Sequence, residues 1–118
     1  MNNDASFYKK WGYSTTQGGW TSVPNLLLKH SGRLNISPTE LVILIQLMRF
    51  WWKEEDLPYP SISKTSEEMG ITRKTASKYF GLLKEKGYIR DIELPNGRIA
   101  YSLDGLIRTL DAISREGE

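Results

Sequence analysis

The sequence predicts a mainly α-helical domain with a small β-hairpin towards its C-terminal end. Apolar residues recur at helical spacing in several segments, and Ser or Thr stands where those helices would begin. Two short alternating segments flank Pro95-Asn96-Gly97, a strong turn sequence, and these predict the hairpin. The chain has 118 residues, which suits one domain around one hydrophobic core.

The composition excludes several classes of site. The sequence contains no Cys, which rules out disulfides, thiol nucleophiles and Cys-based zinc sites. Its single histidine, His30, is expected to be structural or solvent-facing, so we predict no metal and no cofactor. No nucleophile–base pair, carboxylate dyad or phosphate-binding glycine loop is visible, so we expect no enzyme. We see no secretory signal and no apolar stretch of the roughly 20 residues that span a bilayer, and we expect a cytoplasmic protein without membrane contact.

Residues 1–20 are expected to form an extended arm that can include short strands. The arm is rich in aromatic side chains, namely Phe7, Tyr8, Trp11, Tyr13 and Trp20. Five aromatics are too many for a disordered tail, so some of them are expected to pack on the domain or on a second subunit. The domain itself is predicted to cover residues 21–118.

Two helices are predicted at the start of this domain. A short one begins at Pro24-Asn25, carries three leucines and stops at Gly32. In the second, Ser37 is the N-cap candidate, Pro38 suits the first helical position and Glu40 completes a capping box.

The body of the second helix, LVILIQLMRFWW, is apolar nearly all round. Such a helix is central to a domain or shared with a partner. It is expected to end at Trp51 and Trp52, and packing in a core or an interface is favoured for this pair over base stacking. The acidic segment KEEDLPYP that follows is predicted to be a loop.

Residues 63–86 predict two helices joined by a tight turn. Ser63 is expected to cap the first helix, and Gly70 suits the left-handed residue that follows a helix. Thr72 is expected to cap the second helix, which stops at Gly87. Two helices joined by about three residues that include Gly form a helix-turn-helix.

The second of these helices, residues 72–86, has an apolar face and a cationic face. Ala76, Tyr79 or Phe80, and Leu83 follow the spacing of a buried face. Basic and small residues share the other side, namely Arg73, Lys74, Ser77, Lys78, Gly81 and Lys84. Gly81 lowers helix stability, and it can admit a close neighbour, either DNA backbone or another helix.

The positive charge of the chain is concentrated in one segment. The net charge is +2, yet residues 64–90 contain seven Lys or Arg and only three Glu, a local charge of +4. Such a concentration favours a polyanionic partner. On charge alone, a solvated charged face explains it equally well.

The hairpin is predicted within residues 88–103, with Arg98 beside its tip. Asp104 is expected to cap a final helix over residues 104–115. The apolar residues of that helix are Leu106, Ile107, Leu110 and Ile113.

A helix-turn-helix followed directly by a hairpin predicts a winged helix-turn-helix, an arrangement that suits duplex DNA. The N-terminal residues of a helix in the major groove meet base edges, and Arg73 and Lys74 occupy those positions. Thr72 and the helix N-terminus can hold a phosphate, and Arg98 can reach a flanking minor groove or its backbone. The residues expected to contact DNA are Lys64, Thr72, Arg73, Lys74, Thr75, Ser77, Lys78 and Arg98.

At these residues the sequence resembles the winged helix-turn-helix domains of plasmid and phage replication initiators and of DnaD-like proteins, and also those of MarR-like regulators. Those domains typically read Pro-Ser, Glu-Glu-Leu-Gly, Val/Ile-Ser-Arg-Arg-Thr-Val and Leu-x-Glu-Lys-Gly-Leu-Ile. The matching segments are Pro60-Ser61, Glu67-Glu68-Met69-Gly70, Ile71-Thr72-Arg73-Lys74-Thr75-Ala76 and Leu83-Lys84-Glu85-Lys86-Gly87-Tyr88-Ile89. The resemblance covers about Trp20 to Asp91, and it implies DNA binding by a dimer.

The sequence departs from this pattern at two places. Thr65-Ser66 stands where Leu-Ala is usual, so the first motif helix presents less apolar surface. Ala76 replaces a β-branched residue, so the packing there is looser or is completed by the aromatic residues. Neither departure removes the proposed DNA-contacting face.

The leading interpretation is a sequence-specific double-stranded DNA-binding protein, either a transcription regulator or a replication-initiator-type module. The helix at 72–86 would lie in the major groove and the wing on the flanking backbone. The alternative is a winged-helix protein–protein interaction module without DNA binding, in which the cations are solvated or meet an acidic partner. We also expect a homodimer that pairs through the arm and the final helix.

Overall fold

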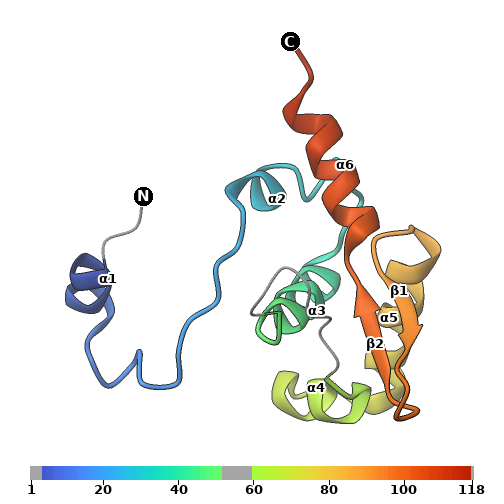
Figure 1. Cartoon of the computed structure of the whole chain (residues 1–118), viewed down its shortest axis with the longest axis horizontal. Helices are drawn as coiled ribbons and strands as arrows, with labels where there is room; N and C mark the ends of the chain where they lie inside the picture. The colour runs from blue at the N-terminus through green and yellow to red at the C-terminus, as the bar shows by residue number, and fades with distance from the viewer. Residues whose placement is uncertain (1–3, 52–59, 118) are drawn as a thin grey trace.

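The computed structural model describes residues 4–51 and 60–117. Its helices and strands follow in the order α1 Asp4–Trp11, α2 Asn25–Lys29, α3 Pro38–Met48, α4 Ile62–Met69, α5 Arg73–Glu85, β1 Arg90–Glu93, β2 Ile99–Ser102 and α6 Asp104–Ser114. Helices α3, α4 and α5 form a body with the β1–β2 hairpin, while α1 stands away from this body at the end of an extended segment (Figure 1). This is the mainly helical fold with a hairpin that the sequence predicts.

The start of the arm is a helix, α1, and the extended conformation expected there is wrong. Gly12 ends this helix with a φ of 85°, and its N–H donates to the carbonyl of Tyr8 at 2.7 Å. Trp20 returns to the helix, with its ring centroid 4.7 Å from that of Phe7 and 5.8 Å from that of Tyr8. Aromatic packing within the arm, together with a glycine stop, therefore stabilises a helix that shows no clear apolar period.

The capping box predicted for α3 is confirmed. The Ser37 hydroxyl accepts from the N–H of Glu40 at 3.2 Å, and the Glu40 carboxylate accepts from the N–H of Ser37 at 3.0 Å. Upstream, α2 begins as predicted but ends at Lys29, before Gly32.

Helix α3 ends earlier than predicted, at Met48. The N–H groups of Phe50 and Trp51 each donate to a carbonyl three residues back, at 3.1 Å. These shorter-range bonds tighten the chain and stop the α-helix. The predicted end at Trp52 and the predicted acidic loop lie outside the described residues.

Helices α4 and α5 form the helix-turn-helix, and Ser61, not Ser63, caps α4. The Ser61 hydroxyl accepts from the N–H of Lys64 at 3.0 Å. Helix α4 therefore starts at residue 62. Its inward face includes Thr65 and Ser66, which are both buried. The predicted cap at Ser63 would leave that inward face less than two turns long.

The turn between these helices is built as predicted. Gly70 adopts a φ of 69°, a left-handed conformation that costs glycine little. The Thr72 hydroxyl accepts from the N–H of Thr75 at 3.1 Å and so caps α5. Because the Gly70 conformation and the Thr72 cap both depend on neighbouring residues only, the sequence was sufficient to predict this turn.

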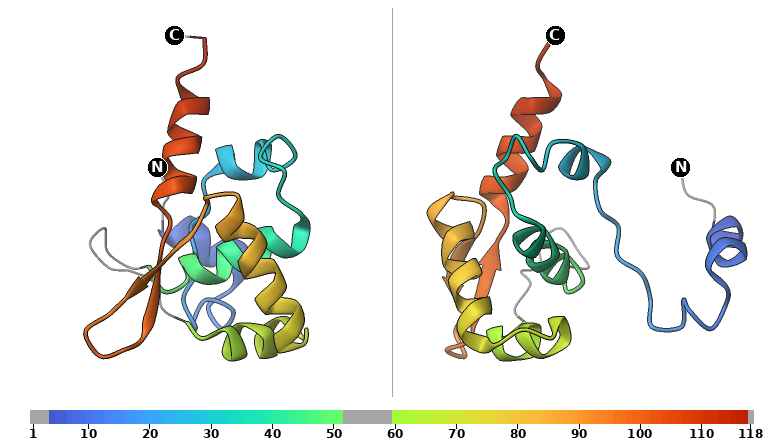
Figure 2. Two further views of the ribbon diagram at one scale, coloured as in Figure 1. Left: turned by 90° about the vertical axis from the view of Figure 1, so that its right-hand side faces the viewer. Right: turned by 180° about the vertical axis from the view of Figure 1, so that it is seen from behind.

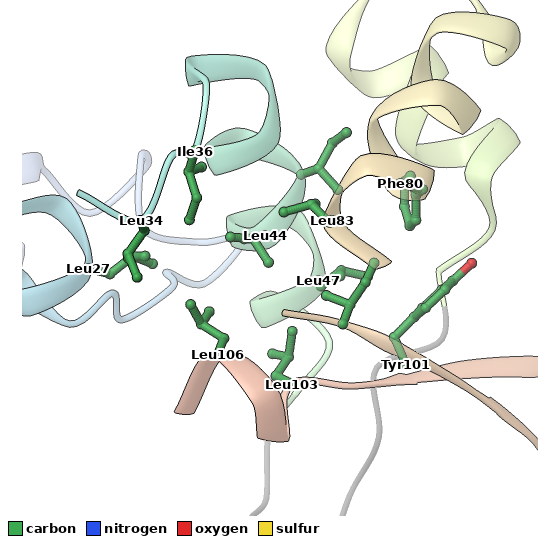
Figure 3. Packing of buried hydrophobic residues seen from close by; sticks show 12 residues of the cluster. Leu27, Leu34, Ile36, Leu44, Leu47, Phe80, Leu83, Tyr101, Leu103 and Leu106 are labelled. Carbon is green, nitrogen blue, oxygen red and sulfur yellow. The ribbon is translucent and has the colours of Figure 1, made fainter. Parts of the chain in front are cut away.

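One hydrophobic core joins α2, α3, α5, the hairpin and the start of α6 (Figure 3). From α5 it takes Ala76, Phe80 and Leu83, all fully buried, while Tyr79 is only partly buried. The Phe80 ring packs on Tyr101 of β2 at 5.3 Å between centroids. This aromatic contact joins α5 to the hairpin within the core.

The hairpin pairs β1 and β2 in antiparallel register from Arg90 opposite Ser102 to Glu93 opposite Ile99. The N–H of Leu94 donates to the carbonyl of Arg98 at 2.8 Å and closes the turn. This confirms the predicted hairpin.

Helix α6 follows β2 directly and starts without a side-chain cap. Leu103 occupies the N-cap position, and Asp104 is the first helical residue, so the cap predicted at Asp104 is wrong. Its N–H instead donates to the hydroxyl of Ser102 at 3.2 Å. A carboxylate in the first turn still interacts favourably with the helix dipole.

The first turn of α6 lies against the turn that ends α5. A Cβ added at Gly105 would come within 1.7 Å of the carbonyl oxygen of Gly87. The absence of a side chain at Gly105 therefore sets the distance between α6 and the rest of the body.

Candidate nucleic-acid interface

Helix α4, the first turn of α5 and the tip of the β1–β2 hairpin lie at the same end of the molecule (Figures 1 and 2). The C-terminal end of α6 points the opposite way. All the residues expected to contact DNA belong to these three segments or to their edges.

Helix α5 separates its side chains as predicted. Ala76, Phe80 and Leu83 are buried on the inner side. The outer side exposes Arg73, Lys74, Ser77 and Lys78, and Thr75 is partly exposed. The predicted contact residues of α5 thus form one surface that begins at its N-terminus.

The cations of this region divide into paired and unpaired groups. Lys84 pairs with Asp91 at 3.1 Å, and Lys86 pairs with Glu40 at 2.7 Å. Within the described residues, no salt bridge is formed by Lys64, Arg73, Lys74 or Lys78. These four exposed cations lie on α4 and the first half of α5, and we call them the cationic face.

A family model described as a helix-turn-helix domain matches residues 34–89, which run from the loop before α3 to the end of the turn after α5. The chain carries a winged helix-turn-helix domain. The winged helix-turn-helix fold predicted from the sequence is confirmed, and the matched helix-turn-helix supports DNA binding.

Two crystal structures are similar to this winged helix-turn-helix protein. The N-terminal domain of DnaD from Geobacillus kaustophilus is 24% identical, with a TM-score of 0.66 over 97% of this chain and 91% of that chain. The YusO protein from Bacillus subtilis is 16% identical, with a TM-score of 0.50 over 94% of this chain and 76% of that chain. Both similarities concern the fold. No curated protein matches the sequence.

The second helix of a helix-turn-helix is called its recognition helix, and here it is α5. The two threonines at its start bond to each other. The Thr72 hydroxyl, which caps the helix, also donates to the hydroxyl of Thr75 at 2.9 Å. The two hydroxyls are thus held together at the exposed N-terminus of the helix, where Thr72 provides the cap.

The remaining two predicted residues flank the recognition helix of this domain. Lys64 lies exposed in α4. Arg98 is exposed at the base of the hairpin turn, and its N–H donates to the side-chain oxygen of Asn96 at 3.0 Å. This bond fixes the backbone that carries the Arg98 side chain at the wing.

A buried ion pair, absent from the sequence prediction, holds the recognition helix of the winged domain on α3. Glu40 is only 2% exposed, and both its carboxylate oxygens accept from the ammonium of Lys86, at 2.9 and 2.7 Å. The same ammonium donates to the carbonyl of Asn35 at 2.5 Å.

Burial alone would raise the pKa of Glu40, but hydrogen bonds from Lys86 and Ser37 outweigh it and lower that pKa. Glu40 therefore stays ionised and pairs with the last turn of the recognition helix. The sequence signal was a carboxylate on a largely apolar helix, which needs a partner when it is buried. That partner is 46 residues away and could not be identified from spacing.

Gly81 lies near the middle of the recognition helix, and a Cβ there would meet nothing within 4 Å. No other helix of the described chain therefore fills the space that the sequence analysis left for a helix or for DNA backbone. None of the described helices is long and apolar enough to cross a membrane. Residues 4–51 and 60–117 also contain no group of three His, Asp or Glu side chains arranged to hold a metal ion.

Proposed function

We propose that this protein binds double-stranded DNA sequence-specifically, as a transcription regulator or a replication-initiator-type module, and acts by binding and not by catalysis. Helix α5 lies in the major groove with its first turn towards the bases, and the wing lies on the flanking backbone. The observation that carries the proposal is the cationic face. Its four Lys and Arg side chains are exposed and form no salt bridge in the described chain, whereas Lys84 and Lys86, at the other end of the same helix, are paired with carboxylates.

The first test concerns base contacts by Arg73. Selection from a random duplex pool provides the preferred site, and Arg73→Ala is then expected to lower affinity for it by about 1–3 kcal/mol and to relax specificity. Arg108→Ala is the matched control, because it removes an exposed Arg from α6 at a distance from the cationic face. Unchanged affinity and preference in both Arg73→Ala and Lys74→Ala would overturn the assignment of this surface.

The second test concerns the wing. Because Arg98 is expected to meet phosphate or the minor groove, Arg98→Ala should weaken binding to all sequences alike and lower the salt slope by about one unit. A selective loss for one sequence with an unchanged slope would mean that the wing reads bases.

The interpretation as a protein–protein module makes the opposite prediction for duplex DNA. A DNA-binding protein has measurable, salt-dependent affinity for random duplex at low ionic strength. Absence of this binding in the wild-type protein would favour an acidic protein partner for the cationic face.

We further propose a homodimer that pairs through the arm and α6. Large apolar side chains are exposed on both, with Tyr13 at 72%, Trp11 at 57% and Ile107 at 42%. A two-fold dimer would place two α5 helices about 34 Å apart and favour a palindromic site. Light scattering tests this, and a mass that stays near 13.5 kDa as concentration rises would exclude a dimer in free solution.

A further inference from the structure

One face of the β1–β2 hairpin is turned towards α5. The Tyr101 ring packs on Phe80 of α5 at 5.3 Å between centroids. Asp91, the partner of Tyr101 in the strand register, pairs with Lys84 of α5 at 3.1 Å. This face of the hairpin is therefore held on α5 by an aromatic contact and by an ion pair.

The next two residues on the same face of the hairpin are exposed. Side chains alternate between the two faces of a strand, so the paired residues Glu93 and Ile99 follow Asp91 and Tyr101 towards the tip. Ile99 is 42% exposed and Glu93 is also exposed, whereas Tyr101 is only 4% exposed. The face is thus buried against α5 at Tyr101 and open beyond it, and we call Glu93 and Ile99 the open wing face.

The open wing face lies across from the first half of the recognition helix. Ser77 and Arg73 stand one turn and two turns before Phe80, on the same side of α5. The hairpin tip and the first turn of α5 lie at the same end of the molecule (Figures 1 and 2). The side of α5 that carries Arg73 and Ser77 is therefore the side that the open wing face approaches.

Glu93 brings an unneutralised negative charge to this part of the protein. Asp91, on the same face, is paired with Lys84, but Glu93 forms no salt bridge within residues 4–51 and 60–117. A free carboxylate therefore stands beside the cationic face, in the region that the proposed function assigns to a polyanion.

The proposed binding mode determines what meets this carboxylate. If α5 lies in the major groove and the wing lies on the flanking minor groove or backbone, the strand that separates the two grooves passes between them. Arg73 and Ser77 then approach this strand from one side and Glu93 approaches it from the other. Because the strand carries a phosphate at every nucleotide, the carboxylate meets charges of its own sign, and salt screens the repulsion.

We propose that Glu93 limits the affinity of this protein for DNA, because its carboxylate repels the phosphates of the strand that passes between α5 and the wing. The inference rests on the proposed function and adds to it a residue that acts against binding. Since phosphates are the same in every sequence, Glu93 lowers the affinity for all duplexes by a similar factor and leaves the preferred site unchanged.

The test is a charge series at position 93, measured by fluorescence anisotropy with a fluorescein-labelled duplex of random sequence. Glu93→Gln should tighten binding about threefold at about 0.05 M salt and less than about 1.5-fold at about 0.3 M, where screening is stronger. Glu93→Lys should tighten it further and raise the salt slope by about one unit, because it adds a phosphate contact. Both variants are expected to fold, since Glu93 is exposed, and circular dichroism verifies this.

Asp111→Asn and Asp111→Lys are the matched controls. They make the same changes in net charge at an exposed position of α6, whose C-terminal end points away from the hairpin tip. We expect each of them to change the affinity for the random duplex by less than about 1.5-fold.

The outcomes separate this inference from the proposed function. If the wild-type protein shows no salt-dependent binding to the random duplex, both are overturned together. If it binds but the Glu93 and Asp111 variants have equal effects, only net charge matters and the role of Glu93 alone is refuted. Weaker binding of Glu93→Gln would also refute that role, because Glu93 would then contact DNA favourably, either directly or through a bound divalent cation.

Discussion

The close contact between Gly105 and Gly87 predicts that Gly105→Ala destabilises the protein. Replacing Gly105 with alanine places a methyl group 1.7 Å from the Gly87 carbonyl oxygen and 2.9 Å from its carbon, whereas an ordinary contact at a Cβ is 3.4–4 Å. Both sides of the contact are backbone, so no side chain can rotate away. Either the first turn of α6 or the turn after α5 must move by more than an ångström.

The loss of stability expected for Gly105→Ala follows from the core residues beside it in the chain. Leu103 and Leu106, on either side of Gly105, are 4% and 2% exposed and pack in the core. Forcing extra volume into a packed core costs typically about 1–3 kcal/mol, and we expect the upper end because two backbone segments are pressed together. Gly81→Ala, in open space on α5, should instead stabilise the protein by roughly 1 kcal/mol through helix propensity. The two Gly→Ala substitutions are thus expected to differ by about 4 kcal/mol.

Urea unfolding followed by circular dichroism measures both variants against the wild-type protein. Gly105→Ala should lower the midpoint and Gly81→Ala should raise it, with similar m-values if the unfolded surfaces match. In a thermal melt, the two melting temperatures should move in opposite directions, by about 4 °C per kcal/mol. Equal or higher stability of Gly105→Ala would refute the close approach of α6 to Gly87.

Other predictions concern the buried ion pair and the cap of α4. Lys86→Met should destabilise the protein by about 3 kcal/mol, because it leaves the buried Glu40 carboxylate without its cation. If urea unfolding shows a loss of stability under about 0.5 kcal/mol, Glu40 is solvated and not buried. Since the folded-state pKa of Glu40 is lowered, its contribution is complete above the unfolded value of about 4.3 and disappears as pH falls through the lower folded value. The urea midpoint should therefore fall more steeply in this acid range for wild type than for Glu40→Gln. Ser61→Ala should cost about 1 kcal/mol and Ser63→Ala less than about 0.5, and the reverse order would contradict the observed cap.

Signals that act within a few residues predicted the fold well. The capping box at Ser37, the cap at Thr72, the glycine turn at Gly70 and the hairpin turn all depend on neighbouring residues, and all are observed. The helical period of α5 likewise predicted which side chains face outward. The candidate interface was therefore predictable, because it consists of exposed residues on two adjacent local elements and a hairpin.

The predictions that failed depended on packing between segments or on a choice between neighbouring residues. Nothing local distinguishes Ser61 from Ser63 as a cap, since the inward face of α4 decides it. The approach of Gly105 to Gly87 and the pairing of Lys86 with Glu40 join elements far apart in sequence. The contact of Arg49, just after α3, with Glu68 on α4 likewise forms only when the helices are packed.

The aromatic arm has a consequence for cooperativity. Its rings come from residues near in sequence, with Phe7, Tyr8 and Tyr13 all within 14 positions of Trp20, so closing this cluster costs little chain entropy. Helix α1 contributes nothing to the buried core cluster, which begins at Leu27. We therefore expect the arm to open and close on its own, without the body. Its amides should exchange with solvent hydrogen through local opening, while those of α3 and α5 exchange only through global unfolding. A single two-state transition would then describe the body of this protein but not the whole chain.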